Sequence, residues 1–387
     1  MKKRVFLQKK ILFIAMPNSI HTARWLSQFK DFEEYEIHIF PSINANWHKE
    51  ILQDKKLILH NYEFPKEYNY EDVSGKGLEI VSAEIEKLID NIKPDIIHTL
   101  EMQHAGYLVL PLKLKYKNSF PLWFYSCWGS DIRYFENVDK HKERISKVLE
   151  NCDALFSGDK LSIEKAKTKY NFTKPIINVP SPGGSKIKYF DQMIKYKKPS
   201  KRKIILVKGY TGWVYKLDVL IEALLLCSEE LIKNKYTVKI YIPPSDKKYI
   251  KQLQDAGIKV EIFKHTQCYD DVIKFYSTAR INLASSLSDG VPNSMLEGMM
   301  VGVFPIQSNA GAVSEYITNG LNGILLNPLD VNGYADAIKL IIKNDELVDN
   351  AALINKKIIE ERLDYDIIKN KVRNFYNLFF KKEESVN

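Results

Sequence analysis

Short apolar runs that alternate with helical patterns constrain the fold of this chain more than any other feature of its sequence. In the first half the predicted strands are residues 11–16, 36–40, 95–98 and 122–126, and the predicted helices are residues 22–29 and 80–92. Strands that alternate with helices form parallel sheets, because each crossover returns the chain to the same sheet edge. We therefore predict an α/β fold with a doubly wound parallel sheet.

The same alternation restarts near residue 203. The predicted segments of the second half are strands 203–207, 238–242, 258–263 and 281–284 and helices 217–232, 247–256, 271–278, 334–342 and 347–362. Between the halves, Pro180, Pro182, Gly183 and Gly184 interrupt regular structure. We predict two Rossmann-like domains, residues 1–182 and 203–364, a basic linker at 183–202 and a last helix at about 365–387.

Composition favours a globular protein of the cytoplasm. The 387 residues are 45% apolar, which suits two packed cores and argues against disorder. The four cysteines form no C-x-x-C pair, as is typical of reduced thiols. Basic residues precede the apolar run 11–16, but that run is too short for a signal peptide, and no run approaches membrane-spanning length.

The chain is basic, with a net charge of +9. Eight of its bases fall within residues 186–203, where Asp191 is the one acid. A solvated hinge is one interpretation of this segment, and a peripheral contact with the anionic inner face of the plasma membrane is the other. No zinc-finger spacing or RNA-recognition signature accompanies the charge, so we predict no nucleic-acid partner.

Residues 281–302 contain the main candidates for ligand-binding residues. A strand at 281–284 leads into a loop with Asp289, and a helix from Asn293 places Glu297 in its first turn. Amides at a helix start bind phosphate, and carboxylates bind hydroxyl groups, so the stretch suits a nucleotide sugar. A structural interpretation stays open: Ser294 and Glu297 have capping-box spacing, and Asp289 before glycine is an ordinary turn residue.

The stretch 288–326, SDGVPNSMLEGMMVGVFPIQSNAGAVSEYITNGLNGILL, resembles the donor-site signature of glycosyltransferase family 4. In that signature two Glu residues are separated by seven positions; here Asp289 takes the first position and Glu297 the second. Gly302, Pro305 and Glu315 also fall in place. The resemblance implies a GT-B fold, with two Rossmann-like domains facing a central cleft and the last helix packed back on the first domain.

The resemblance also implies roles for single residues. Asp289, Lys216 and Glu297 are the expected catalytic residues, with Lys216 at the position of the family's phosphate-binding lysine. Tyr210 replaces the family's arginine, and Lys208 is a candidate second cation. The expected nucleotide-sugar-binding residues are Lys208, Gly209, Tyr210, Gly290, Val291, Pro292, Asn293, Ser294, Met295, Leu296 and Glu315.

In the first half, the loop with Ser19 and His21 is similar to the family's first strand-to-helix loop. The segment ending in Asp131 resembles its His-Gly-Ser-Asp motif, with Trp128 in place of the histidine. These four residues are the expected acceptor-site residues, although helix capping explains Ser19 and Asp131 equally well. His98 and His104 are either site residues or structural.

Together these features predict a retaining, metal-independent hexosyltransferase. It needs no cofactor and uses a nucleotide-diphosphate sugar, UDP-sugar being the expected donor. A glycan, a lipopolysaccharide or a lipid-linked oligosaccharide is the expected acceptor, as in polysaccharide or lipopolysaccharide biosynthesis. Three alternatives remain: a sugar-nucleotide epimerase, a non-catalytic nucleotide-sugar-binding protein, and a nucleic-acid binder that would explain the charge alone.

Overall fold

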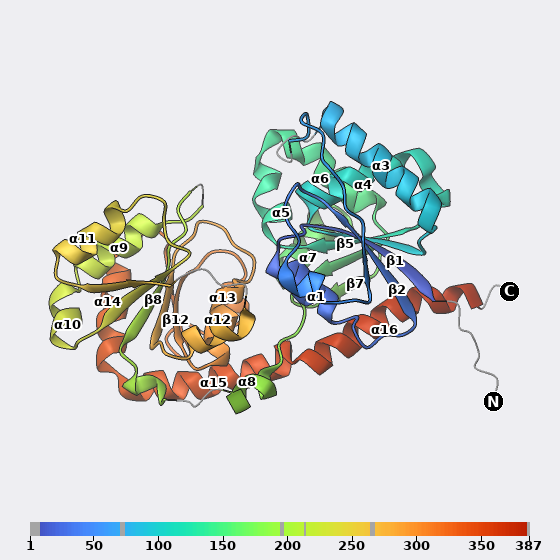
Figure 1. The fold of residues 1–387 in the computed structure, drawn as a ribbon. Helices are drawn as coiled ribbons and strands as arrows, with labels where there is room; N and C mark the ends of the chain where they lie inside the picture. Colours follow the sequence, from blue (N-terminus) through green and yellow to red (C-terminus); the bar gives the residue numbers. More distant parts are fainter. Residues whose placement is uncertain (1–7, 70–73, 194–196, 213, 264–267, 385–387) are drawn as a thin grey trace, which may run out of the picture. The chain divides into compact units, whose positions relative to one another are not determined.

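The computed structural model describes residues 8–69, 74–193, 197–212, 214–263 and 268–384. Internal contacts divide the chain into two units, residues 1–184 with 365–387, and residues 185–364. Each unit contains one parallel sheet with helices packed on it (Figure 1). The predicted α/β class with two doubly wound sheets is therefore confirmed.

The sheet of the first unit has the strand order β3-β2-β1-β4-β5-β6-β7, and every pairing is parallel. The strands are β1 (Lys9–Ala15), β2 (Tyr35–Pro41), β3 (Leu57–Leu59), β4 (Ile96–Leu100), β5 (Leu122–Cys127), β6 (Ala154–Ser157) and β7 (Ile176–Asn178). The order reverses between β1 and β4. In open parallel sheets, ligands bind beyond the carboxyl ends of the strands at such a reversal.

Helices cover both faces of this sheet. They are α1 (Ile20–Ser27), α2 (Lys49–Leu52), α3 (Lys76–Ile92), α4 (Tyr107–Tyr116), α5 (Ser130–Arg133), α6 (Asp139–Asn151), α7 (Lys160–Lys169) and α16 (Tyr365–Glu384). A π-helical turn, η1 (Met102–Gly106), joins β4 to α4, and 3-10 turns follow at η2 (Lys117–Ser119) and η3 (Phe135–Asn137).

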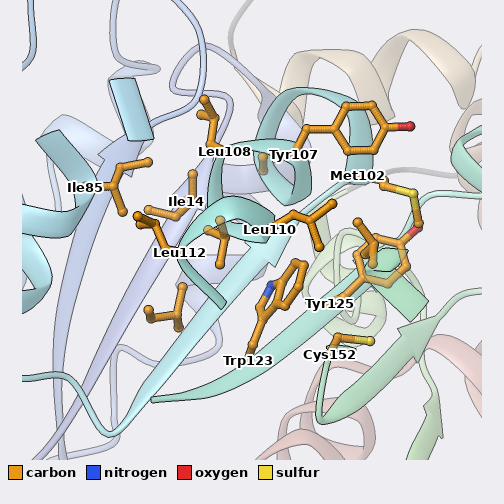
Figure 2. Close-up of a cluster of buried hydrophobic side chains, with 14 of the residues drawn as sticks. Ile14, Ile85, Met102, Tyr107, Leu108, Leu110, Leu112, Trp123, Tyr125 and Cys152 are labelled. Atoms are coloured by element: carbon orange, nitrogen blue, oxygen red, sulfur yellow. The ribbon is translucent and has the colours of Figure 1, made fainter. Parts of the chain in front are cut away.

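The central strand β1 is apolar on both faces because both faces are covered. Ile14 belongs to a core that includes Ile85 of α3 and Leu108 and Leu112 of α4 (Figure 2). Phe13, on the opposite face, belongs to a second core with residues of α1 and α16. A strand buried on both sides has a continuous apolar run instead of an alternating one, as residues 11–15 do.

The second unit repeats this strand order on a six-stranded parallel sheet, β10-β9-β8-β11-β12-β13. The strands are β8 (Ile204–Lys208), β9 (Thr237–Tyr241), β10 (Lys259–Ile262), β11 (Ile281–Ala284), β12 (Phe304–Ser308) and β13 (Ile324–Leu326). Here the order reverses between β8 and β11, so the carboxyl ends of these two strands mark the expected binding edge.

The helices of the second unit are α8 (Ile187–Met193), α9 (Leu217–Leu225), α10 (Ser228–Lys233), α11 (Lys248–Asp255), α12 (Tyr269–Tyr276), α13 (Asn293–Met300), α14 (Val331–Lys343) and α15 (Asp345–Leu363), with 3-10 turns η4 (Pro199–Lys201) and η5 (Val313–Glu315).

The prediction of one helix over 217–232 was wrong, since α9 ends before Cys227. The buried Cys227 thiol donates to the carbonyl of Ala335, 3.4 Å away, so a distant contact shapes this break.

The segment predicted as a linker is largely part of the second unit. Ser185 donates its amide to the Leu363 carbonyl at 2.7 Å. Arg202 is fully buried and donates to the carbonyls of Ala279 and Val301, at 3.0 and 2.9 Å. Residues 194–196 lie outside the described residues. By internal contacts, the described residues from 185 onward belong to the second unit, while the lysine side chains described between residues 186 and 203 are exposed.

Acidic residues of α15 balance part of the basic charge in this segment. The Lys198 ammonium lies 2.9 Å from Asp349, and the Lys201 ammonium lies 3.1 Å from Asp345. Across the described ranges, no helix combines the length and apolar character needed to cross a membrane.

Candidate functional site

Two loops run together at the strand-order reversal of the second unit. One follows β8 and the other follows β11. The amide of Lys216 donates to the Ser285 carbonyl at 3.1 Å, and the amide of Leu287 donates to the Val214 carbonyl at 2.8 Å. An isolated antiparallel bridge between residues 215 and 286 lies between these bonds. The backbone thus holds the two predicted lysines beside the loop that carries Asp289.

Lys208 is the last residue of β8, and its side chain turns toward this loop. Its Nζ lies 3.4 Å from Oδ2 of Asp289. It also lies over the rings of Tyr210 and Tyr215, 5.3 and 5.1 Å from their centroids. The two rings stack at 4.8 Å with 27° between their planes. Lys208 therefore has one anionic and two aromatic neighbours.

Lys216 is the N-cap residue of α9 and is partly buried. Within the part of the chain that the structure describes, its ammonium forms no ion pair or hydrogen bond. An ammonium held by its backbone at a binding edge, without a protein counter-ion, is suited to an anionic ligand.

The tyrosines of this cluster stay protonated at neutral pH. Burial raises the pKa of Tyr210, and the nearby charge of Asp289 raises it further. The same two causes, burial first, raise the pKa of Tyr215. The charges of the cluster are therefore those of its lysines and of Asp289.

The first turn of α13 supplies backbone donors. Pro292 is the N-cap residue, and its carbonyl accepts from the amides of Met295 and Leu296 at 3.0 and 3.2 Å. Among the described residues, no acceptor pairs with the amides of Asn293 and Ser294. Free amides at a helix start, together with the helix dipole, favour a phosphate group.

The helix start also corrects two sequence predictions. Because α13 begins at Asn293, Ser294 already lies inside the helix and makes no capping bond, so the capping box does not form. Glu297 lies in the second turn, not the first. Its charge contributes to the raised pKa of Tyr276, where burial is the largest cause, which places the two side chains near each other.

Asn282 is a positioning residue that the sequence analysis missed. It is buried within β11, and its amide nitrogen donates to the Ser294 carbonyl at 3.0 Å. The hydroxyl of Tyr241 donates to the Asn282 side chain at 3.2 Å. These bonds fasten the start of α13 to the sheet. The available signal was a lone amide side chain in an otherwise apolar strand, since buried polar groups need partners.

Glycine at position 311 fixes the loop around Asp289. Gly311 has φ of +70°, and a Cβ atom there would lie 1.9 Å from the Asp289 carbonyl oxygen. The amide of Ala312 donates to the Gly290 carbonyl at 3.3 Å. Val291, the next residue, packs against a buried core. The backbone of Asp289 is thus held closely by its neighbours.

Two further predicted donor-site residues have structural partners. A Cβ at Gly209 would lie 2.6 Å from Ile240 Cγ2, so the glycine permits a close approach to β9. Glu315 lies in η5, with Oε2 3.7 Å from the Arg362 guanidinium of α15. The Glu315 carbonyl also accepts from Arg362. Glu315 therefore ties η5 to α15.

The first unit gathers three of its predicted residues at its own strand-order reversal. Ser19 is the N-cap of α1, and its hydroxyl accepts from the amide of His21 at 3.2 Å. The rings of His21 and Trp128 meet edge to face, with centroids 5.6 Å apart and 84° between planes. An indole beside an imidazole offers a stacking surface and a polar edge, which suits a carbohydrate.

Asp131 differs from these three because it is buried. Its carboxylate accepts from the amide of Trp128 at 3.0 Å, the hydroxyl of Tyr125 at 2.6 Å and the thiol of Cys127 at 3.2 Å. Burial, with a further contribution from the charge of Glu101, raises the pKa of Asp131 to about 6. Asp131 thus anchors the turn after β5 from inside the fold.

The sequence analysis also missed Glu101, which follows β4. Its φ is +85°, a region that non-glycine residues rarely adopt and that costs about 1–3 kcal/mol. Its buried carboxylate accepts from the amides of Gln103 and His104, at 2.5 and 2.7 Å, and lies 2.7 Å from His104 Nδ1. His104 is therefore oriented by a carboxylate.

His98, the other histidine left open, is structural. It is fully buried in β4 and contacts the hydroxyls of Ser126 and Tyr376, the former at 2.8 Å. Burial holds the pKa of His98 well below its usual range.

Metal ligands are not clustered in the described ranges. No group of three or more His, Cys, Asp or Glu side chains that could hold a metal ion occurs there.

Comparisons with known proteins agree with this geometry. The family model described as "Glycosyl transferases group 1" matches residues 189–357, and the model described as "Glycosyl transferase 4-like" matches residues 10–159. Each model thus covers most of one sheet. The chain thus has a GT-B fold, and each of its two units is similar to a glycosyltransferase family model.

The curated relatives have low sequence identity to this chain and align with part of it. The chain is 24% identical over 186 residues to the capsular polysaccharide biosynthesis glycosyltransferase CapM of Staphylococcus aureus, a match that covers 46% of this chain and 47% of CapM. The aligned part thus spans about half the length of that curated relative.

Solved structures match the whole fold. A sucrose-phosphate synthase from Thermosynechococcus elongatus superposes with a TM-score of 0.72 at 13% identity, covering 97% of this chain and 100% of that chain. HepE of Anabaena, solved in complex with UDP-glucose, gives a TM-score of 0.69 at 13% identity, covering 95% and 99%. At these identities the likeness concerns the fold.

Proposed function

We propose that this protein transfers a sugar from a nucleotide-diphosphate sugar, a UDP-sugar in the first instance, to a glycan or lipid-linked acceptor. The observation that carries the proposal is the set of anion-binding groups at the strand-order reversal of the second unit. Lys208, Lys216 and the amides of Asn293 and Ser294 lie on adjoining loops there. Relatives support the class of reaction, since CapM is described as a capsular polysaccharide glycosyltransferase and HepE is solved with UDP-glucose.

In the proposed reaction, the bond between the anomeric carbon and the diphosphate oxygen breaks as negative charge gathers on the diphosphate. The ammonium groups of Lys216 and Lys208 and the helix-start amides stabilise that charge. Glu297 accepts hydrogen bonds from the ribose hydroxyls, and the loop from Asp289 to Pro292 holds the sugar ring. These contacts place the leaving group and the sugar on one unit.

We propose that the transfer retains the configuration of the donor sugar and needs no metal ion. The acceptor oxygen forms the new bond to the anomeric carbon on the face that the diphosphate leaves. The departing phosphate oxygen takes the acceptor's proton, so no side chain is required as the base. The lysines and amides supply the positive charge that a metal ion would otherwise supply.

We propose that the acceptor is a carbohydrate recognised in the first unit by Ser19, His21 and Trp128. The edge-to-face rings of His21 and Trp128 support this assignment, because sugar rings stack on indoles and bond to imidazoles. A glycan, lipopolysaccharide or lipid-linked oligosaccharide meets this chemistry. A contact of the segment around residues 186–203 with anionic lipid, on the cytoplasmic side, accompanies the lipid-linked form of the proposal.

The test begins with a thermal-shift panel of UDP-, GDP-, ADP- and dTDP-sugars. We expect one class of donor to raise the unfolding temperature, because a ligand that binds only the folded state stabilises it. The stabilising donor is then incubated with the protein and a panel of acceptor glycans, with and without EDTA. Product linkage is read by NMR.

The outcomes separate the alternatives. A product that keeps the donor's anomeric configuration and forms in EDTA supports the whole proposal. An inverted product, or one that EDTA abolishes, contradicts the retaining or the metal-independent part. Isomerisation of the donor without acceptor favours an epimerase. No stabilisation by any nucleotide sugar contradicts the proposed function itself.

A further inference from the structure

Two residues that we propose to bind the two halves of the donor pair with each other. Lys208, placed for the diphosphate, and Asp289, placed for the sugar, form an ion pair 3.4 Å long. Within the described residues, Asp289 is the one acidic side chain that Lys208 pairs with. The pair therefore withdraws a cation and an acceptor from the groups proposed to bind the donor.

The geometry of this pair makes it exchangeable. At 3.4 Å the contact is longer than a strong charge-assisted bond, and both side chains keep some exposure, 12% for Lys208 and 23% for Asp289. Partly exposed pairs of this kind are weak and are easily replaced by a stronger partner. A diphosphate, with more charge and several acceptor oxygens, is such a partner.

Neighbouring contacts hold each member in place whether or not the pair is formed. The rings of Tyr210 and Tyr215 lie beneath the ammonium of Lys208. Oδ1 of Asp289 accepts from the amide of Gly290 at 2.8 Å, which leaves Oδ2 as the oxygen that faces Lys208. Gly311 fixes the Asp289 backbone. Breaking the pair therefore releases the ammonium of Lys208 while both side chains keep these neighbouring contacts.

We propose that donor binding exchanges the partners of this pair. The diphosphate takes the ammonium of Lys208, and the carboxylate of Asp289 exchanges that ammonium for a hydroxyl of the sugar, from which it accepts a hydrogen bond. The inference rests on the proposed function, since it assumes a nucleotide-diphosphate sugar at this edge. It makes Asp289 an intramolecular competitor of the diphosphate and links recognition of the sugar to recognition of the phosphates.

The test measures UDP binding by isothermal titration calorimetry for four proteins: wild type, Asp289→Asn, Lys208→Met and the double variant. Asparagine keeps an acceptor for the Gly290 amide but removes the charge that competes for Lys208. We expect Asp289→Asn to bind UDP about two- to fivefold more tightly, the range that losing a partly exposed pair corresponds to. Lys208→Met should bind UDP several-fold more weakly.

The double variant decides whether the two effects are coupled. In the Lys208→Met background, the asparagine substitution should no longer tighten UDP binding, because there is no ammonium to release. Turnover of the UDP-sugar by Asp289→Asn should fall at least tenfold even though UDP binds more tightly. The matched control is the exposed pair Lys251–Asp255 of the same unit, where Asp255→Asn should change neither quantity.

The outcomes are distinct for the two proposals. If wild type binds UDP, and Lys216→Ala weakens that binding, but Asp289→Asn leaves it unchanged or weaker, the exchange is refuted and the proposed function stands. Equal tightening in the presence and absence of Lys208 also refutes the exchange. If wild type binds neither UDP nor GDP, ADP or dTDP, both proposals are refuted. Far-UV circular dichroism melts of each variant confirm that the fold is retained.

Discussion

Replacing Asp131 by asparagine should change the pH dependence of stability in a way that the structure specifies. Burial raises the pKa of this carboxyl from 3.8 to about 6 in the folded protein. The folded state therefore binds a proton between these values that the unfolded state has released. Stability from this group is present below pH 4 and is lost as the pH rises toward 6.

The magnitude follows from the shift. A difference of one pKa unit corresponds to 1.36 kcal/mol, so a rise from 3.8 to about 6 corresponds to about 3 kcal/mol. Asparagine cannot titrate, and its amide oxygen can still accept from the Trp128 amide. We expect the free energy of unfolding of Asp131→Asn, minus that of wild type, to increase by about 2.4 kcal/mol between pH 4 and pH 7, because part of the effect already falls below pH 4. Any constant cost of the lost bonds cancels in this change.

The assay is urea unfolding of both proteins, followed by far-UV circular dichroism at half-unit pH steps. Other groups that titrate in this range, such as His141, whose pKa burial lowers to about 4, are present in both proteins and cancel. Asp139→Asn is the matched control, because this exposed aspartate has a pKa that its Lys142 partner lowers. A difference curve for Asp131→Asn that is flat from pH 4 to 7, or that falls, would refute the reasoning.

Three further outcomes follow from other contacts. Lys216→Ala and Glu297→Ala should each lower donor turnover about tenfold or more in a transfer assay, with an unchanged melting temperature. The control variant Lys251→Ala should have no effect. Full activity of both site variants would contradict the proposed donor site. Arg280→Met should lower the free energy of unfolding by about 1–3 kcal/mol in urea, because it leaves buried backbone carbonyls that accept from this fully buried guanidinium without a donor. A stability equal to that of wild type would contradict this reasoning. Gly311→Ala should weaken UDP-sugar binding in calorimetry, because the new Cβ would collide with the Asp289 carbonyl. Gly320→Ala should not weaken it, since Gly320 also has a positive φ but has open space around it. Equal effects of the two substitutions would show that backbone strain alone is responsible.

The sequence predicted the sheets well because their strands are encoded by local pattern. Residues 11–15 and 281–284 are buried on both faces. Strands of this kind appear in a sequence as short, mainly apolar runs, so they can be predicted from local pattern. The predicted helix at 80–92 fell inside α3 for a similar reason, since its apolar stripe packs against one core.

What the sequence did not show depends on contacts between distant residues. The break before α10 involves a bond between Cys227 and Ala335, which are 108 positions apart. The segment from residue 185 onward looked like a basic hinge because its lysines dominate the composition. Its attachment to the second unit includes the buried Arg202, which bonds to carbonyls 77 and 99 positions away. Local pattern carries no information about such partners.

The candidate site was predictable in part for the same reason. Asp289, Lys208 and Lys216 could be named from spacing and resemblance, and the structure brings their loops together. Asn282 and Glu101 were missed, because their importance comes from one buried amide bond and one backbone conformation. Neither feature can be read from residue type alone.

The candidate sites of the two units differ in chemistry, and this difference supports the proposed assignment of donor and acceptor. In the second unit the reversal carries Lys208, Lys216 and free helix-start amides, a combination that favours an anion. In the first unit, buried carboxylates follow β4 and its neighbour β5, those of Glu101 and Asp131. A phosphate there would face like charge in a medium of low dielectric constant, which is strongly unfavourable. Both carboxylates already accept hydrogen bonds within their own turns, so the proposed contacts with acceptor hydroxyls fall to Ser19, His21 and Trp128. We therefore propose that the diphosphate binds the second unit and that a neutral polyhydroxylated acceptor binds the first.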